Sequence, residues 1–222
     1  MSFPAPPLLL VTDRAQAQLP LEDVVSRACA GGCRWVSLRE KDLPADEQIE
    51  LARTLAPIAQ RYGARLTLHG DADLARTAGI NGVHLSATGD AAAARTLLGP
   101  HALVGISIHN AADAAALDPR VVDYAIAGPA FLTVSKPGYG PALGPGGLAA
   151  ICRAARVPVI AIGGIEADNV SEVTKAGVAG VAVMGSVMRS AEPDKRMKDL
   201  LAALAVSGLI RPPALSPSAP RA

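Results

Sequence analysis

The apolar residues of this chain gather in short runs, separated by longer stretches in which apolar positions recur every three or four residues. The runs are too short for helices and rich in β-branched residues, so they predict strands buried on both faces, as in a parallel sheet. Eight such strands are expected, at residues 8–11, 35–38, 66–69, 82–85, 103–107, 124–127, 157–162 and 181–184.

The stretches between the strands have helical spacing, for example at Ile49, Leu51, Leu55 and Ile58. Strand and helix therefore alternate, which favours a single (β/α)8 domain, a TIM barrel. The alternative is an open doubly wound sheet. That fold carries three spaced glycines after its first strand to bind a dinucleotide, whereas Val11-Thr12-Asp13-Arg14 stands at that place here.

The length of 222 residues, half of them apolar, suits one compact domain. We expect the barrel over residues 1–206 and a disordered tail over residues 207–222, which are dominated by Pro, Ser, Ala and Arg. Asp168 or Asn169 is expected to cap the helix before the last strand. The Gly- and Pro-rich connection 132–146 is long enough to serve as a lid over the barrel mouth.

The charge balance argues against a macromolecular polyanion as partner. The chain has 21 Lys and Arg against 20 Asp and Glu, a net charge of +1, and only 3% aromatic residues. Neither nucleic acid nor a membrane is therefore expected, and any anion must be bound locally. Small phosphorylated molecules are the expected partners, while the sequence leaves open whether the chain forms a homo-oligomer.

The cysteines and the N-terminus indicate a cytoplasmic protein. Cys29, Cys33 and Cys152 are an odd number without metal-ligand spacing, so buried free thiols in a reducing compartment are expected. The N-terminus lacks the basic and apolar regions of a signal peptide, and no apolar run approaches the roughly 18 residues of a membrane span.

Glycines follow the last two predicted strands. Gly163 and Gly164 end the seventh strand, and Gly185 with Ser186 ends the eighth. In a (β/α)8 barrel, turns at these two places commonly form a phosphate site, because backbone N–H groups stay free of side-chain cover. The alternative is that the glycines only make tight turns between strand and helix.

Two cations follow the second predicted strand. Side chains alternate along a strand, so Arg39 and Lys41 are expected to point to the same side as Ser37. Two cations on the barrel side are costly to bury unless an anion meets them, and the guanidinium can bind phosphate through two hydrogen bonds. The alternative is a surface ion pair of Arg39 with Glu40 or Asp42.

Hydroxyl, imidazole and ammonium groups also fall near the carboxyl ends of predicted strands. His69 and His109 could act as acid, base or orienting donor. His84 alternates with apolar residues and is interpreted as a hydrogen-bonded core imidazole. Thr133, Ser135 and Lys136 lie after the sixth strand and could surround a diphosphate, although Lys136 could equally be a solvated charge in a loop.

Several of these stretches occur together, in order, between about residues 8 and 204. They are Leu38-Arg39-Glu40-Lys41, Gly82-Val83-His84-Leu85, Gly105-Ile106-Ser107-Ile108-His109, Gly128-Pro129-Ala130-Phe131, Thr133-Val134-Ser135-Lys136, 158–165 and 180–186. The series resembles thiamine phosphate synthase and its tautomerase-like relatives. The resemblance implies an enzyme that joins hydroxymethylpyrimidine diphosphate to thiazole phosphate and releases pyrophosphate, with Mg²⁺ assisting departure of the diphosphate.

The resemblance also suggests roles for the residues collected above. The predicted catalytic residues are Lys136, Ser107 and His109. The predicted substrate-binding residues are Ser37, Arg39, Lys41, His69, Thr133 and Ser135 for the pyrimidine diphosphate and Gly163, Gly164, Gly185 and Ser186 for the thiazole phosphate. Asp71 and Asp90 are the candidate Mg²⁺ ligands.

The chain departs from the synthase pattern at three places. Ser37 replaces a glutamine, His69-Gly70 replaces an Asn-Asp pair, and the segment ending at Asp90 is one residue longer than in the family. Both metal positions are therefore displaced, which matters because Mg²⁺ demands near-octahedral geometry. The leading hypothesis is the synthase; a metal-independent thiazole phosphate tautomerase and a non-catalytic thiazole or thiamine phosphate-binding protein are the alternatives.

Overall fold

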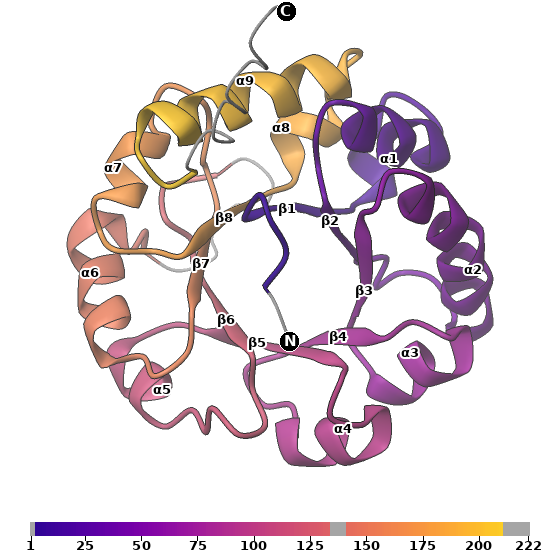
Figure 1. Ribbon diagram of the computed structural model, residues 1–222, viewed down its shortest axis with the longest axis horizontal. Helices are drawn as coiled ribbons and strands as arrows, with labels where there is room; N and C mark the ends of the chain where they lie inside the picture. The colour runs from indigo at the N-terminus through magenta and orange to yellow at the C-terminus, as the bar shows by residue number, and fades with distance from the viewer. Residues whose placement is uncertain (1–2, 134–140, 211–222) are drawn as a thin grey trace, which may run out of the picture.

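The computed structural model describes residues 3–133 and 141–210, and its centre is a closed ring of eight parallel strands (Figure 1). Each strand pairs with the next in the sequence, and β8 pairs with β1 to close the ring. The strands are β1 Leu8–Val11, β2 Trp35–Leu38, β3 Arg65–His69, β4 Gly82–Leu85, β5 Leu103–Ile108, β6 Tyr124–Ala127, β7 Val159–Ile162 and β8 Gly180–Val183. This confirms the predicted single-domain (β/α)8 barrel.

Helices cover the outside of the ring in chain order (Figure 1). They are η1 Arg14–Gln16, α1 Leu21–Ala30, α2 Ala45–Arg61, α3 Ala72–Ala78, α4 Ala91–Leu98, α5 Ala111–Ala115, α6 Gly144–Ala154, α7 Val170–Thr174, α8 Gly185–Met188 and α9 Pro193–Val206. In α2, Ala52, Leu55 and Ala59 form the buried stripe that packs on the barrel.

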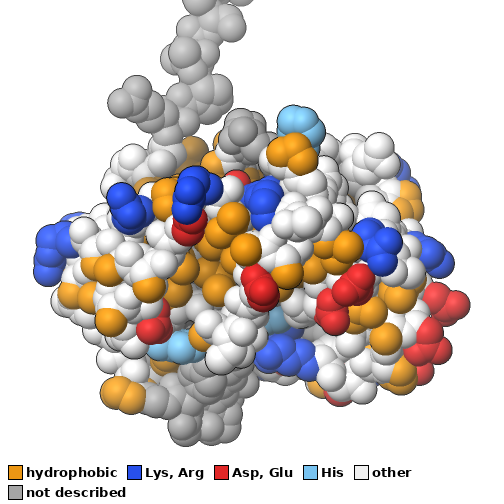
Figure 2. Space-filling model, turned by 90° about the horizontal axis from the view of Figure 1, so that it is seen from below, with side chains coloured by type: hydrophobic (Ala, Val, Ile, Leu, Met, Phe, Trp, Pro, Cys, Tyr) orange, Lys and Arg blue, Asp and Glu red, His pale blue; other side chains and the backbone are white. Residues whose placement is uncertain are grey.

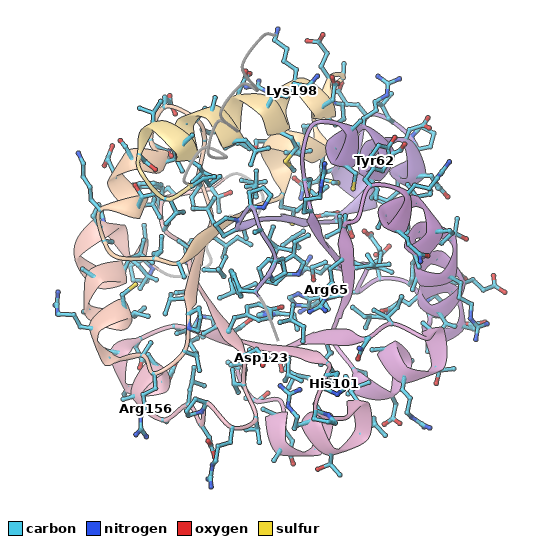
Figure 3. All side chains as sticks on the ribbon, viewed as in Figure 1. Tyr62, Arg65, His101, Asp123, Arg156 and Lys198 are labelled. Atoms are coloured by element: carbon cyan, nitrogen blue, oxygen red, sulfur yellow. The ribbon has the colours of Figure 1, made fainter. Side chains whose placement is uncertain are left out.

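Alternation along the strands gives the molecule two hydrophobic cores. In β1, Leu8 and Leu10 face the helices, whereas Leu9 and Val11 belong to a separate cluster inside the ring. Both faces of every strand are therefore covered, which is why the strands read as continuous apolar runs. Figure 3 shows side chains filling the ring, with Arg65 inside it and Arg156 and Lys198 pointing outward.

An aromatic cluster closes the amino-terminal end of the barrel interior. Trp35 and Tyr124 are the first residues of β2 and β6, and their rings pack edge to face with centroids 4.7 Å apart. Phe3 packs edge to face on Trp35 at 5.2 Å. With that end filled, the carboxyl ends of the strands are where the barrel interior can admit a ligand.

The predicted strand bounds differ little from the observed ones. Four strands agree at both ends, while β5 continues to Ile108 and β7 begins at Val159 rather than at residue 157. The predicted strand at 181–184 was one residue late, because Met184 already lies at the start of α8. The predicted tail at 207–222 falls largely outside the described residues, since the description ends at residue 210.

The surface carries charges of both signs. Figure 2 shows Lys and Arg interspersed with Asp and Glu on the face that it presents, in keeping with the net charge of +1. Within the described residues, no helix is long and apolar enough to cross a membrane. Cys29, Cys33 and Cys152 are free thiols, as predicted. The first two are fully buried, whereas Cys152 is only partly buried, so the prediction of burial was wrong for Cys152.

Candidate active site

A cavity of about 130 Å³ opens at the carboxyl ends of the strands. Its walls include apolar side chains of β1, β6, β7 and β8, and its polar groups come from the loops that follow the strands. It is lined by Val11, Arg39, His69, His84, Ser107, His109, Ile126, Gly128, Pro129, Thr133, Ile162, Gly163, Gly164, Ile165, Glu166, Ala182, Val183, Met184, Gly185, Ser186 and Arg189. The fold thus places Val11, near the start of the chain, and Arg189, near the end of the barrel, in the wall of the same cavity.

The glycines after β7 are required by their conformation and by their neighbours. Gly163 and Gly164 have φ of +104° and +64°, which side chains rarely tolerate. A Cβ on Gly163 would lie 2.8 Å from Cβ of Pro129, and one on Gly164 would lie 2.7 Å from the carbonyl oxygen of Leu132. These glycines therefore let the loop after β7 pass close to the loop after β6, at the edge of the cavity.

Hydrogen bonds fix this corner. The N–H of Ala130 donates to the carbonyl of Ile162 at 2.8 Å. Asn169 binds the turn from the other side, since its Nδ2 donates to the carbonyl of Gly164 at 2.8 Å and its Oδ1 accepts from the N–H of Glu166 at 2.9 Å. The predicted helix cap was therefore wrong in mechanism: Asn169 precedes α7 but makes no side-chain cap bond to it, because its amide serves the glycine turn instead.

Gly185 and Ser186 follow β8, the strand next to β7. Both begin the short helix α8, and both line the cavity. All four predicted phosphate-cradle residues therefore line one cavity, after two neighbouring strands. We call this group the glycine corner, defined as Gly163, Gly164, Gly185 and Ser186.

Arg39 and Lys41 lie near the mouth without a carboxylate partner among the described residues. Arg39 lines the cavity, and Lys41 lines an adjacent hollow. Burial, and next the positive charge of Arg39, lowers the pKa of Lys41 below its ordinary value. The alternative ion pair of Arg39 with Asp42 is not formed, because Asp42 pairs with Arg14 at 2.7 Å.

His84 and Ser107 form a part-buried pair in the wall of the cavity. Nε2 of His84 lies 2.9 Å from Oγ of Ser107, and the imidazole is fully buried. Burial, with a smaller contribution from the charge of Lys41, lowers the pKa of His84 from 6.5 to about 3, so the ring is neutral at physiological pH. It is therefore the hydrogen-bonded core imidazole that its position predicted, and it also reaches the cavity wall.

The other predicted residues are distributed around this pair. The ring of His69 lies 4.9 Å from that of His84, and His109 lines the cavity while its backbone N–H donates to Asp113 at 2.9 Å. Ser37 is completely buried inside the barrel, and its Oγ has no hydrogen-bond partner within the described residues. Thr133 lines the cavity, whereas Ser135, Lys136 and most of the predicted lid lie outside the described residues.

The candidate metal ligands share the hollow beside the cavity. Asp71 and Asp90 line it together with Lys41 and His69. Each carboxylate also caps a helix through Oδ1: Asp71 accepts from the N–H of Asp73 at 2.8 Å, and Asp90 from the N–H of Ala93 at 2.9 Å.

The donor types of Asp71 and Asp90 are compatible with Mg²⁺. Among the residues that the structure describes, no group of three or more His, Cys, Asp and Glu is arranged to hold a metal. Mg²⁺ is usually bound by one or two carboxylates together with substrate phosphates and water, rather than by protein alone. Asp71 and Asp90 supply that number of carboxylates in one hollow.

Two charged cavity residues were missed from the sequence. Glu166 and Arg189 line the cavity close to the glycine corner. Burial raises the pKa of Glu166 above its ordinary value, while Arg196 and Arg189 oppose that rise. Arg189 is held by Gln16, which accepts a hydrogen bond from its guanidinium. The available signal was position, since Glu166 is two residues beyond Gly164 and Arg189 is three residues beyond Ser186.

Comparison with known proteins agrees with this geometry. A family model described as thiamine monophosphate synthase matches residues 8–187. A protein of Geobacter sulfurreducens named "Putative thiamine-phosphate synthase" is 44% identical over 199 residues, which are 89% of this chain and 93% of that protein. The thiamine-phosphate synthase of Chlorobium luteolum is 36% identical over 91% of this chain and 95% of its own.

A solved structure gives the same result. Thiamine phosphate pyrophosphorylase from Pyrococcus furiosus superposes with a TM-score of 0.80 at 29% identity, covering 90% of this chain and 96% of that one. The family match spans all eight strands, and the relatives are covered over nearly their whole length. On its sequence, its barrel and its cavity, the chain belongs to the thiamine monophosphate synthase family.

Proposed function

We propose that this protein joins hydroxymethylpyrimidine diphosphate to thiazole phosphate, forming thiamine phosphate and releasing pyrophosphate. The observation that carries the proposal is a single barrel mouth with two anion sites of different construction. The glycine corner follows the adjacent strands β7 and β8, whereas Arg39 and Lys41, which lack carboxylate partners among the described residues, follow β2 and form what we call the cationic end of the site. Two phosphorylated substrates need two such sites.

Arg39 and Lys41 are assigned to the diphosphate, and Thr133 and Ser107 supply hydroxyl donors on the same side. The C–O bond between the pyrimidine methylene and the diphosphate breaks, and its electron pair leaves with pyrophosphate. Negative charge thus grows on the leaving group, and fixed cations stabilise that growth more than they stabilise the bound substrate. When bound by Asp71 and Asp90, Mg²⁺ would neutralise part of the same charge.

The glycine corner is assigned to the thiazole phosphate. Held there, the thiazole nitrogen can attack the methylene carbon as the diphosphate departs, forming the new C–N bond. Water would compete for the same electron-poor carbon. The apolar side chains of Val11, Ile126, Ile162, Ala182 and Met184 line the cavity and limit that access.

The neutral imidazole of His84 fits this scheme as a hydrogen-bond partner rather than as a charge. Its Nε2 lies 2.9 Å from Oγ of Ser107, and either atom can donate, depending on the tautomer. A neutral ring adds no positive charge beside a developing carbocation. We therefore assign His84 to orienting the Ser107 hydroxyl toward the diphosphate. The cytoplasmic location expected from the reduced thiols belongs to the same proposal.

The test is a coupling assay on the full chain with both substrates and Mg²⁺, with thiamine phosphate and pyrophosphate quantified separately. We expect stoichiometric formation of both products, loss of activity on chelation, and loss in Lys136→Ala. Lys198→Ala is the matched control, because Lys198 lies on α9 and pairs with Asp194 at the surface.

Other outcomes would contradict the synthase and identify what replaces it. Isomerisation of a thiazole carboxylate phosphate that survives chelation and is lost in His69→Ala or His109→Ala would indicate the tautomerase. Calorimetric binding of thiazole phosphate or thiamine phosphate without turnover of either reaction would indicate the non-catalytic binding protein.

A further inference from the structure

The loops after β1 and β2 are joined by a buried polar network centred on Thr12 and Glu40. The hydroxyl of Thr12 donates to Oε1 of Glu40 at 2.6 Å and accepts from the backbone N–H of Arg39 at 2.9 Å. Oε2 of Glu40 accepts from the N–H of Arg14 at 2.9 Å. Thr12 is fully buried, and Glu40 is 2% exposed.

Further contacts hold the same two loops together. The N–H of Thr12 donates to the carbonyl of Ser37 at 3.0 Å, which continues the β1–β2 ladder beyond the strands. The N–H of Leu43 donates to the carbonyl of Glu40 at 3.1 Å and closes the following turn. At the surface, Arg14 pairs with Asp42 at 2.7 Å. Residues 12–14 and 37–43 therefore form one connected unit.

The side chains of this unit differ in whether they line the cavity or the hollow. Neither Thr12 nor Glu40 lines the cavity or the adjacent hollow, whereas Arg39 lines the first and Lys41 the second. Glu40 stands between the two cations in the sequence, so the hydrogen bonds that hold its carboxylate against the β1 loop also fix the backbone from which Arg39 and Lys41 project.

Burying a carboxylate costs more free energy than burying an apolar side chain, if the group only holds two loops together. Burial is the largest influence on the pKa of Glu40 and raises it, while the hydrogen bonds from Thr12 and from the Arg14 backbone lower it again. A buried acid costs free energy unless its acceptor atoms are satisfied, and here both oxygens accept a hydrogen bond. An apolar side chain would pack the two loops at lower cost but would leave the hydroxyl of Thr12 and the N–H of Arg14 without their acceptors.

We propose that Thr12 and Glu40 are positioning residues for the diphosphate site, which set the backbone of Arg39 and Lys41 so that both cations converge on one anion. The proposal rests on the proposed function and deepens it. Small shifts of these cations would matter, because a displacement of about 1 Å in catalytic geometry can lower the rate roughly 100-fold. Thr12 and Glu40 act on the substrate only through their two cationic neighbours.

The experiment compares Thr12→Val with Thr12→Ser in the full chain. Valine keeps the shape of threonine but removes both hydrogen bonds, whereas serine keeps the hydroxyl. Calorimetric titration with pyrophosphate and Mg²⁺ measures the diphosphate site alone, and steady-state kinetics give KM for each substrate. For Thr12→Val we expect pyrophosphate affinity to fall by about 10-fold or more, with a matching rise in KM for the pyrimidine diphosphate. KM for thiazole phosphate should stay within about twofold, and Thr12→Ser should restore the wild-type values.

Glu40→Gln provides a second, independent variant. The amide has one oxygen where the carboxylate has two, so it cannot accept from both Thr12 and the Arg14 N–H. We expect a loss of pyrophosphate affinity in the same direction, between about 3-fold and 10-fold, again without a change in KM for thiazole phosphate. If Thr12→Val does not fold, the pyrophosphate affinities of Glu40→Gln and Thr12→Ser are compared instead.

Several outcomes would overturn the inference. Unchanged pyrophosphate affinity in Thr12→Val and Glu40→Gln would show that the network does not position the cations. An equal weakening for pyrophosphate and thiazole phosphate would show a general structural role. Failure of the wild-type protein to bind pyrophosphate at all would instead contradict the proposed function.

Discussion

The glycine corner and the cationic end of the site differ in the part of the chain that meets the anion. At the glycine corner the backbone itself approaches the cavity, and the space that a Cβ would need is taken by Pro129 and Leu132. At the cationic end the candidate ligands are long side chains, Arg39 and Lys41, and two helix-capping carboxylates. Gly163 and Gly164 cannot take a side chain without strain, whereas a site made of side chains can be rebuilt with other residues.

The departures from the family pattern follow this division. Both glycine turns match the synthase pattern, while Ser37, His69-Gly70 and the longer segment before Asp90 all lie on the side-chain end. A side chain that moves by one residue can be compensated by a neighbour, as Asp71 and Asp90 illustrate by lining one hollow. The comparison therefore predicts that substitutions at the two ends have different signatures.

The largest effect is expected at Arg39. Arg39→Ala removes a guanidinium that has no ion-pair partner among the described residues and whose free donors are available to an anion. We expect kcat/KM for the pyrimidine diphosphate to fall by about 100-fold to 1,000-fold, the scale for losing one transition-state charge donor. Initial rates at varied concentrations of each substrate measure it.

Arg120→Ala is the control for Arg39→Ala, since Arg120 is an exposed arginine that pairs with Asp118. Its kinetics should equal those of the wild type. A loss in Arg39→Ala that appears mainly in KM for thiazole phosphate would remove the distinction between the two ends.

Gly164→Ala should affect the opposite substrate. The alanine must adopt φ near +64° with its Cβ 2.7 Å from a carbonyl oxygen, so the turn has to shift. We expect KM for thiazole phosphate to rise by about 10-fold to 100-fold, and the free energy of unfolding to fall by about 1–3 kcal/mol. Kinetics and urea unfolding measure the two effects separately.

Gly79→Ala separates backbone strain from the site. Gly79 has φ of +75° at the end of α3, and a Cβ there would meet nothing within 4 Å. It should lose stability without any change in KM. If Gly164→Ala behaves in the same way as this variant, the glycine corner does not bind the phosphate.

Asp71→Asn and Asp90→Asn test the proposed metal end. Asparagine caps a helix about as well as aspartate, so stability should be kept while a charged ligand is lost. We expect the Mg²⁺ concentration for half-maximal rate to rise by at least about 10-fold, since even outer-shell changes reach that size. Activity against Mg²⁺ concentration gives this value.

Asp73→Asn is the matched control for the metal end. Asp73 lines the same hollow but pairs with Arg76 at 3.2 Å. The substitution removes the same negative charge, so an equal shift in its Mg²⁺ requirement would mean that only the overall charge of the hollow matters, and Asp71 and Asp90 would not be ligands.

The smallest effect is a pH dependence of stability caused by His84, which lines the cavity. Because its folded-state pKa is about 3 against 6.5, the unfolded chain binds a proton in that range that the folded chain does not. Its contribution to stability is complete above pH 6.5 and is lost as pH falls, by at most about 1.4 kcal/mol per pH unit.

Urea unfolding at several values between about pH 7 and pH 5 measures that slope. His84→Gln should flatten it, whereas His101→Gln, at an exposed position, should retain the wild-type slope. An unchanged slope in His84→Gln would show that this buried imidazole takes up its proton in the folded protein.

The sequence predicted most of the scaffold because each strand is buried on both faces. Every residue of runs such as Leu8–Val11 and Tyr124–Ala127 is buried, so these strands need apolar neighbours on both faces. A barrel provides them, with its filled interior on one face and a layer of helices on the other. Boundaries shifted only at strand ends, as at Met184, where the residue after the strand is as apolar as the strand.

The site was predictable to the extent that barrel topology places strand ends on one mouth. His69, Ser107 and the glycines were found in this way. Glu166, Arg189 and the Thr12–Glu40 network were not, because their importance depends on contacts between segments far apart in the chain. Glu40 in particular looks like a surface charge in the sequence, and only the fold shows it buried.

The sequence by itself determined the alternation of strands and helices and the glycines that follow the last strands, because these properties depend on local burial and backbone conformation. It favoured a barrel over an open sheet, but the pairing of β8 with β1 is a tertiary contact. Tertiary structure decided which polar groups share a cavity and which carboxylates are consumed as caps or buried partners. It decided them because hydrogen bonds and charges act over a few ångströms in space, between residues that the sequence places up to 173 positions apart, as the hydrogen bond from Arg189 to Gln16 shows.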